Sequence, residues 1–126
     1  MFRTLLFIPG NNKRFVEKAR SLNADIICFD LEDSVPLNEK QNARDIVSEA
    51  LDKKEDYGNR NVYVRINSYE SGIAIQDLDA IVSDEIDGVV VPKVNDEKEV
   101  RHLVRRLIEL ERQKTMSKKM GMMASI

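Results

Sequence analysis

The sequence has one cysteine, Cys28, no tryptophan, one histidine and three prolines. An internal disulfide is therefore impossible, and Cys28 lies in an apolar run where a thiol serves as a small core side chain. A net charge of −2 gives no electrostatic basis for binding nucleic acid or an anionic membrane. No apolar run approaches the length of a membrane span, and the first residues lack the layout of a signal peptide. We therefore expect a cytoplasmic protein without nucleic-acid or membrane partners.

The composition is that of a folded domain. The 126 residues are 42% hydrophobic and 33% charged, which is enough apolar surface for one core. Short apolar runs predict strands at residues 4–8, 26–29, 62–66, 88–92 and 120–126. Apolar residues at helical spacing lie between them, with Asn11 or Asn12, Asn38 and Asn95 as candidate helix N-caps. Strands that alternate with helices predict a parallel sheet with right-handed crossovers.

Two α/β architectures fit this pattern. A doubly wound domain of the flavodoxin or receiver type has the right size, and a receiver would act as a phosphoacceptor or binding module. A doubly wound domain, however, needs a helix after its fifth strand, and none is predicted here. A receiver also carries its acids on the first and third strands, whereas the acids of this sequence follow the second. The alternative is the amino-terminal half of a TIM (β/α)8 barrel, whose strand ends converge on one site. We favour the barrel, with residues 1–126 as one partial domain truncated after the fifth strand.

An acidic cluster follows the second predicted strand. Asp30, Glu32 and Asp33 come directly after the apolar run 26–29. Because side chains alternate along a strand, we expect Asp30 and Glu32 on one face and Asp33 on the other. Unpaired buried charges are costly, so these acids suit the open carboxyl edge of a sheet, where ligands bind in α/β folds. A purely structural role, capping the next helix, remains open.

Four sequence blocks occur in order and span nearly the whole chain. They are RTLLFIPGN at 3–11, FDLEDSVP at 29–36 with Lys40 and Arg44, VRIN at 64–67 and GVVVPK at 88–93. Together they resemble the citrate lyase beta-subunit family, which includes malyl-CoA and citramalyl-CoA lyases of the HpcH/HpaI aldolase superfamily. The resemblance implies a TIM barrel and Mg²⁺-dependent cleavage of a carbon–carbon bond beside an acyl thioester, giving an acetyl thioester of CoA or a carrier protein and a 2-oxo acid.

The resemblance also assigns catalytic roles. Arg65 would grip the carboxylate of the 2-oxo acid, since a guanidinium can bind a carboxylate in two places. Asp30, Glu32 and Asp33 would shape the site and contact metal-bound water or the arginine. The alternative for Arg65 is an ion pair with Asp30 and Glu32 across adjacent strands, and the two roles are compatible.

Further residues are candidates for contact with substrate or CoA. Lys40 and Arg44 lie one helical turn apart and, by resemblance, would meet the CoA phosphates, or else form a solvated helix face. Arg3 is a weaker candidate of the same kind. The remaining candidates end the first and fourth strands, and they are Pro9, Gly10, Pro92 and Lys93.

By resemblance, the metal ligands are a glutamate ending the fifth strand and an aspartate on the sixth. Both would lie beyond Ile126, so we expect no metal ligand in this sequence and no catalysis by the 126 residues alone. The expected partners are an acyl thioester, a 2-oxo acid and further copies of the chain, as a trimer or hexamer. A non-catalytic half-barrel that pairs with a partner chain is the remaining alternative, and it predicts self-association through open strand edges.

Overall fold

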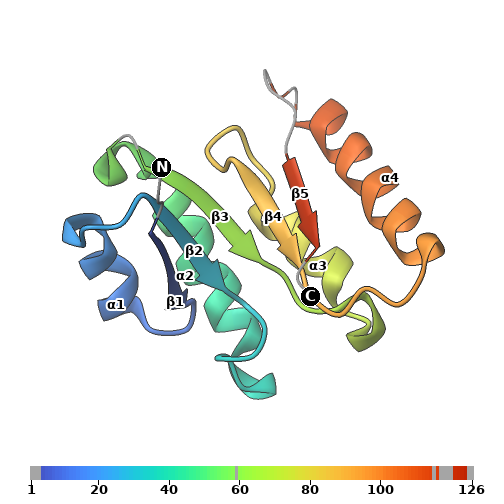
Figure 1. The fold of residues 1–126 in the computed structure, drawn as a ribbon, viewed down its shortest axis with the longest axis horizontal. Helices are drawn as coiled ribbons and strands as arrows, with labels where there is room; N and C mark the ends of the chain where they lie inside the picture. The colour runs from blue at the N-terminus through green and yellow to red at the C-terminus, as the bar shows by residue number, and fades with distance from the viewer. Residues whose placement is uncertain (1–3, 59, 115, 117–120, 125–126) are drawn as a thin grey trace.

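The computed structural model describes residues 4–58, 60–114, 116 and 121–124. Within these residues, five parallel strands form one sheet in the order β1-β2-β3-β4-β5 (Figure 1). The strands are β1 (Leu5–Pro9), β2 (Ile26–Asp30), β3 (Asn61–Arg65), β4 (Gly88–Val91) and β5 (Gly121–Ala124). The α-helices are α1 (Lys13–Lys18), α2 (Lys40–Leu51), α3 (Ala74–Ile81) and α4 (Glu97–Gln113). Short 3₁₀ helices are η1 (Ala19–Ser21), η2 (Leu37–Glu39), η3 (Lys54–Tyr57) and η4 (Tyr69–Ser71).

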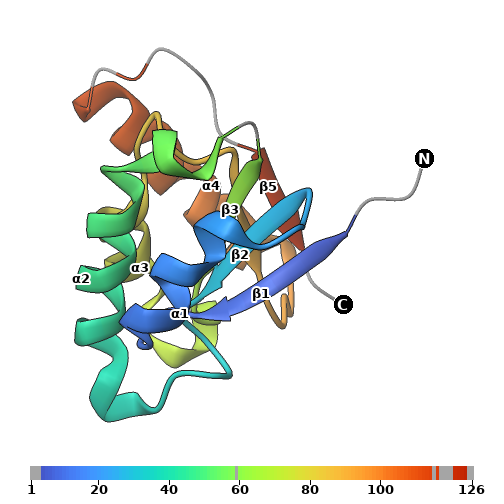
Figure 2. The ribbon, with the colours of Figure 1, turned by 90° about the vertical axis from the view of Figure 1, so that its left-hand side faces the viewer.

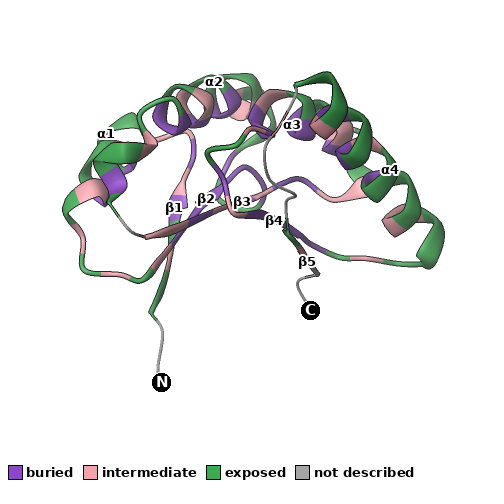
Figure 3. Cartoon of the chain, turned by 90° about the horizontal axis from the view of Figure 1, so that it is seen from above, coloured by how far each residue is buried: buried purple, intermediate pink, exposed green. Residues whose placement is uncertain are grey.

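The α-helices of the described chain all cover one face of the sheet. Figure 2 shows the helices on one side and the strands on the other, and Figure 3 shows the helices arching over the sheet. A doubly wound domain has helices on both faces, and a receiver has the strand order 2-1-3-4-5. The sequential order found here is that of a (β/α)8 barrel, so the barrel prediction is confirmed and the receiver alternative is wrong.

The core lies between the sheet and the helices. Alternate strand residues point toward the helices, and neighbouring strands are in register, with Ile8 beside Phe29 and Phe29 beside Val64. The helix-facing strand side chains, each at most 4% exposed, are Ile8, Ile27, Phe29, Val62, Val64, Val89 and Val91. Within the described residues, no helix is both long and apolar enough to cross a membrane.

Two predictions about the helices need correction. Asn38 makes no capping hydrogen bond, since the chain forms the 3₁₀ helix η2 there. The N-cap of α4 is Asp96, which accepts from the Glu99 amide at 3.0 Å, rather than Asn95.

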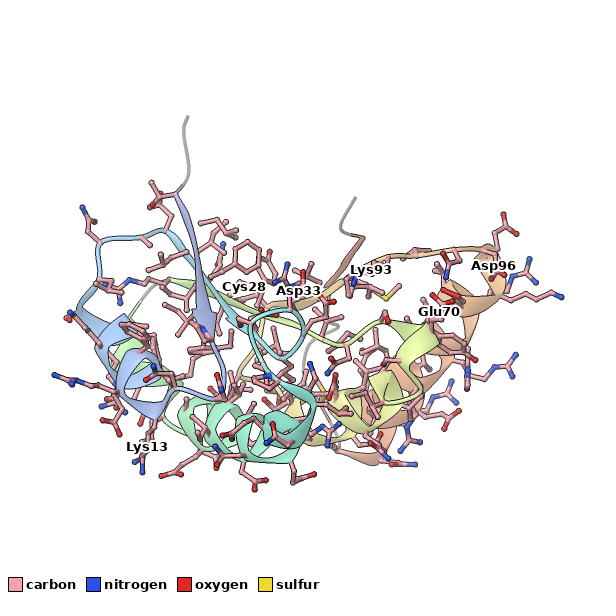
Figure 4. All side chains as sticks on the ribbon, turned by 90° about the horizontal axis from the view of Figure 1, so that it is seen from below. Lys13, Cys28, Asp33, Glu70, Lys93 and Asp96 are labelled. Atoms are coloured by element: carbon pink, nitrogen blue, oxygen red, sulfur yellow. The ribbon has the colours of Figure 1, made fainter. Side chains whose placement is uncertain are left out.

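The other face of the sheet carries the side chains that alternate with the core set. Cys28 belongs to this face and is fully buried, and Figure 4 shows it on the opposite side of the sheet from Lys13 of α1. Burial, followed by the nearby charge of Asp30, raises the pKa of the Cys28 thiol to about 12.

We predict that Cys28 is unreactive in the folded chain, because only an accessible thiolate attacks a disulfide reagent. The release of thionitrobenzoate from a disulfide reagent at pH 8 should therefore follow unfolding in urea and be negligible in buffer. Rapid stoichiometric labelling of the folded chain would contradict the buried position of this side chain.

Candidate functional site

Arg65 ends β3 and lies beside Asp30, which ends β2, because the two residues are register partners in the parallel pair. The Nε and Nη2 atoms of Arg65 donate to Oδ1 and Oδ2 of Asp30, each at 2.8 Å. Arg65 Nε is also 3.8 Å from a Glu32 oxygen. The predicted convergence of this arginine with the acids of the second strand is therefore present in the structure.

Among the described residues, one edge of the Arg65 guanidinium has no hydrogen-bonded partner. In the described part of the chain, no hydrogen bond from Nη1 accompanies those made by Nε and Nη2. The Phe7 ring of β1 lies 4.7 Å from the guanidinium carbon, within cation–π range. Side-on pairing with Asp30 and stacking on Phe7 fix the plane of the guanidinium while leaving Nη1 able to donate to a bound anion.

Asp30 is a buried acceptor, with 1% of its surface exposed. Besides Arg65, it accepts from the Glu32 amide at 2.9 Å, the Ser34 amide at 3.0 Å and the Ser34 hydroxyl at 2.6 Å. Burial raises the pKa of this carboxyl, but the hydrogen bonds from Arg65 and then Ser34 outweigh it and lower the pKa to about 2. Asp30 is therefore ionised at neutral pH and holds both Arg65 and the loop after β2.

This lowered pKa makes the folded state sensitive to acid. The folded pKa of Asp30 is about 2 and its reference value is 3.8, so its contribution to the free energy of unfolding is present above pH 4 and is lost as the pH falls toward 2. The shift corresponds to about 2 kcal/mol. The free energy of unfolding, measured in urea, should fall between pH 6 and pH 2.5. This fall should be smaller by about 2 kcal/mol in Asp30→Asn than in the unaltered protein. An equal fall in both proteins would contradict the pairing.

Glu32, Asp33 and Lys93 form a second ionic group at the same edge. Lys93 follows β4, and its Nζ lies 3.1 Å from Glu32 Oε2 and 3.8 Å from Asp33 Oδ1. Figure 4 shows Asp33 and Lys93 close together on the strand side of the sheet. The expectation that Asp33 faces away from the other two acids is wrong, because β2 ends at Asp30 and strand alternation does not continue into the turn.

The strand ends that carry Pro9, Gly10, Pro92 and Lys93 also reach this edge. Gly10 donates its amide to the Asp30 carbonyl at 2.8 Å, and a Cβ at Gly10 would lie 2.7 Å from that oxygen. Gly10 therefore permits close approach of β2 rather than of a ligand. Pro92 is buried, and Lys93 has a left-handed backbone with φ of 51°, which is strained for a non-glycine residue. That turn directs a 64% exposed side chain toward Glu32.

Lys40 and Arg44 lie in different surroundings, although a shared outward face was predicted. Lys40 Nζ donates to the carbonyls of Leu31 at 2.8 Å and Glu32 at 2.7 Å, so it braces the acidic loop. Arg44 is only 7% exposed, and its Nε is 2.7 Å from Oδ1 of Asp77. The outward-facing prediction is wrong for Arg44, because its guanidinium points between α2 and α3. Arg3 lies outside the described residues.

Sequence reasoning missed several side chains that shape this edge. Phe7 was expected only as a strand residue, and Ser34 was passed over. Asp77 could have been noticed, because it falls on the buried stripe of α3 together with Ala74 and Leu78. A carboxylate at a core position must have buried partners, but the identity of those partners, 10 and 33 residues away, is not readable from local spacing.

The described residues do not by themselves fit a magnesium ion. No group of three or more potential metal-ligating side chains forms among them. Both oxygens of Asp30 accept hydrogen bonds, and Glu32 is shared between Lys93 and Arg65. A hard cation needs several free oxygen ligands, so these carboxylates act as counter-ions of basic side chains.

Comparisons with known proteins identify a family and several curated relatives. The HpcH/HpaI aldolase/citrate lyase family matches residues 3–126. The chain is 43% identical over 94 residues to the (3S)-malyl-CoA thioesterase of Cereibacter sphaeroides strain KD131, covering 75% of this chain and 33% of the relative. It is 46% identical over 92 residues to citrate lyase subunit beta of Leuconostoc mesenteroides subsp. cremoris, covering 73% of this chain and 30% of the relative.

A solved structure shows the same fold. Malate synthase of Haloferax volcanii in its magnesium/glyoxylate complex superimposes with a TM-score of 0.83 at 13% identity, covering 97% of this chain and 41% of that one. This chain spans about a third of the length of the curated relatives it matches. Because the family match extends over nearly every residue, the chain belongs to the HpcH/HpaI aldolase/citrate lyase family.

Proposed function

We propose that the protein of which this chain forms all or part is a carbon–carbon lyase of a hydroxyacyl thioester. Its substrate would be a citryl, citramalyl or malyl thioester, and its products an acetyl thioester and a 2-oxo acid. Residues 1–126 would supply one part of a barrel domain, and the complete protein would use Mg²⁺ and CoA or a carrier-protein thioester. The observation that carries the proposal is Arg65, held side-on by Asp30 at the carboxyl edge, with Nη1 making no hydrogen bond to the described residues.

In this proposal Arg65 binds the carboxylate of the 2-oxo acid part of the substrate. The Asp30 carboxylate fixes the guanidinium plane, and Phe7 covers one of its faces, so Nη1 meets the substrate in a defined direction. A preorganised donor stabilises developing negative charge without the cost of reorienting solvent. Glu32 and Lys93 would line the part of the carboxyl edge next to Arg65. Asp33 would lie on the solvent-exposed side of this pair.

In the proposed cleavage Arg65 lies at the 2-oxo acid end of the substrate. The substrate hydroxyl gives its proton to a general base and becomes the carbonyl of the 2-oxo acid as the carbon–carbon bond breaks, and a proton is later returned to the product carbon. The bonding electron pair passes to the acetyl thioester as an enolate, which is then protonated at carbon. Because Arg65 contacts the carboxylate beside the new carbonyl, it orients that group throughout cleavage.

The other candidate residues keep a proposed role at the thioester end. Pro9 ends β1 and Lys93 follows β4, so these two would line the approach to the site. Gly10 and Pro92 are buried and would shape the same strand ends from within. Lys40 would act through the Leu31 and Glu32 carbonyls that it holds. We propose no CoA contact for Arg44, because its guanidinium is buried against Asp77. Assembly as a homo-oligomer, a trimer or hexamer, is part of the same proposal.

An assay of products tests the function. The protein at its natural length is incubated with citryl-, citramalyl- and malyl-CoA in the presence of Mg²⁺, and acetyl-CoA and 2-oxo acid are quantified by chromatography. We expect equimolar acetyl-CoA and 2-oxo acid from at least one thioester. Release of free CoA with the intact hydroxy acid would indicate hydrolysis, the activity named for the Cereibacter relative, and would contradict the lyase proposal.

A further inference from the structure

A buried polar network lies beneath the carboxyl edge of β3. Asp77 of α3 is fully buried, with 0% of its surface exposed. Its Oδ1 accepts from Arg44 Nε at 2.7 Å, and its Oδ2 accepts from both the amide and the side-chain nitrogen of Asn67, each at 2.7 Å. Asn67 is itself only 3% exposed. One carboxylate thus joins α2, α3 and the segment that follows β3.

Helix packing alone would not require a carboxylate here. Asp77 lies on the apolar stripe of α3, where a leucine would bury more apolar surface. Replacing a buried ion pair by apolar residues is often neutral or stabilising. An apolar side chain could not, however, accept the two hydrogen bonds from Asn67. The carboxylate therefore has a role that an apolar side chain could not fill: it fixes Asn67 through two hydrogen bonds.

Asn67 lies two residues beyond Arg65, just after the end of β3. The intervening Ile66 amide donates to the Val90 carbonyl at 3.1 Å, and the Arg65 carbonyl accepts from Leu31 at 2.9 Å. The backbone of residues 65–67 is therefore hydrogen-bonded to β4 on one side and to Leu31, after β2, on the other. Asp77 of α3 holds it from the helix side of the sheet. Arg44 also contacts Gln41 at 3.0 Å and Gln76 at 3.4 Å, which holds its guanidinium against both helices.

We propose that Asp77, held by Arg44, is a positioning residue that fixes the carboxyl end of β3 through Asn67 and thereby sets the direction of Arg65. This inference rests on the proposed function of Arg65. It also explains a basic residue, Arg44, that the family resemblance assigned to CoA. All three network residues are buried, so the proposal gives none of them a contact with the substrate.

The chain offers a matched control within the same helix. Asp79 lies two residues after Asp77, and its Oδ1 accepts from Arg106 Nε of α4 at 2.8 Å. Asp79→Asn therefore weakens an arginine–aspartate pair between helices without touching β3. Asp77→Asn weakens the network at its centre, and Asn67→Ala removes one of its hydrogen bonds while keeping the Arg44–Asp77 pair, should Asp77→Asn fail to fold.

Two readouts separate positioning from general stability. The first is the Nε–H resonance of Arg65 in the ¹⁵N-labelled protein at its natural length, assigned by its loss in Arg65→Lys. The second is kcat and KM for thioester cleavage by the protein at its natural length, measured at a temperature where urea curves show each variant to be fully folded. If the unaltered protein cleaves no thioester, the proposed function fails, and the resonance still decides the positioning claim.

We expect Asp77→Asn and Asn67→Ala to shift the Arg65 Nε–H resonance and to lower kcat by about 10- to 100-fold, the scale of a small misplacement of a reacting group. Asp79→Asn should change neither. An unshifted resonance in both network variants, or a kcat equal to that of Asp79→Asn in the folded proteins, would overturn the proposal.

Discussion

Replacing Arg65 by lysine is expected to lower kcat/KM for thioester cleavage by at least about 100-fold. Lysine keeps the positive charge but has no planar group that can pair side-on with Asp30 and still present a donor to the substrate. Arg65→Ala removes the charge as well, and it leaves the buried Asp30 carboxylate without its main partner. We therefore expect the alanine variant to lose both activity and stability.

The measurement is the rate of 2-oxo acid formation at saturating and limiting thioester by the protein at its natural length. The control is Arg101→Ala, because Arg101 of α4 is exposed and pairs only with Glu97 among the described residues. This variant should match the unaltered protein within a factor of two or so, since exposed ion pairs contribute little. If Arg65→Lys cleaved at the unaltered rate, Arg65 would not be the carboxylate-binding group.

Asp30→Asn is expected to destabilise the fold by about 3 kcal/mol, the scale for removing one partner of a buried ion pair. Asparagine has nearly the same shape, so packing is preserved, but its amide nitrogen would face the donors of Arg65 or Ser34. The variant should also lose most activity, because Arg65 would no longer be held in one plane.

Urea unfolding followed by far-UV circular dichroism measures the first effect. Asp33→Asn is the matched control: Asp33 is three residues away, its side chain is 67% exposed, and its contact with Lys93 is 3.8 Å long. We expect a change of less than about 0.5 kcal/mol for this control. Equal stability losses in the two variants would show that Asp30 has no special structural role.

The strands and most of the helices could be predicted because their signals are local. The apolar run at 26–29 has strand length and composition, and the spacing of Ala43, Val47, Ala50 and Leu51 is helical. Sequential strands that alternate with helices then restrict the topology to a few choices. What sequence could not provide was the side of the sheet on which helices pack, which separates a barrel from a doubly wound domain.

The pairing of Asp30 with Arg65 could also be predicted, because strand ends are recognisable in the sequence. Asp30 and Arg65 each end a strand, and parallel strands bring their carboxyl ends together, so their approach followed from topology. The stacking of Phe7 on Arg65 and the pairing of Arg44 with Asp77 depend on tertiary contacts between distant residues. Lys40 and Arg44 share a helical spacing, yet one braces a loop and the other is buried, because spacing alone does not reveal what faces a helix.

The most direct test of the proposed site is a crystal structure of the protein at its natural length with a bound 2-oxo acid, such as glyoxylate, pyruvate or oxaloacetate. We predict that the ligand carboxylate accepts a hydrogen bond from Nη1 of Arg65 while Nε and Nη2 keep their contacts with Asp30. A ligand bound at the opposite edge of the sheet, with Nη1 of Arg65 still facing solvent, would contradict it.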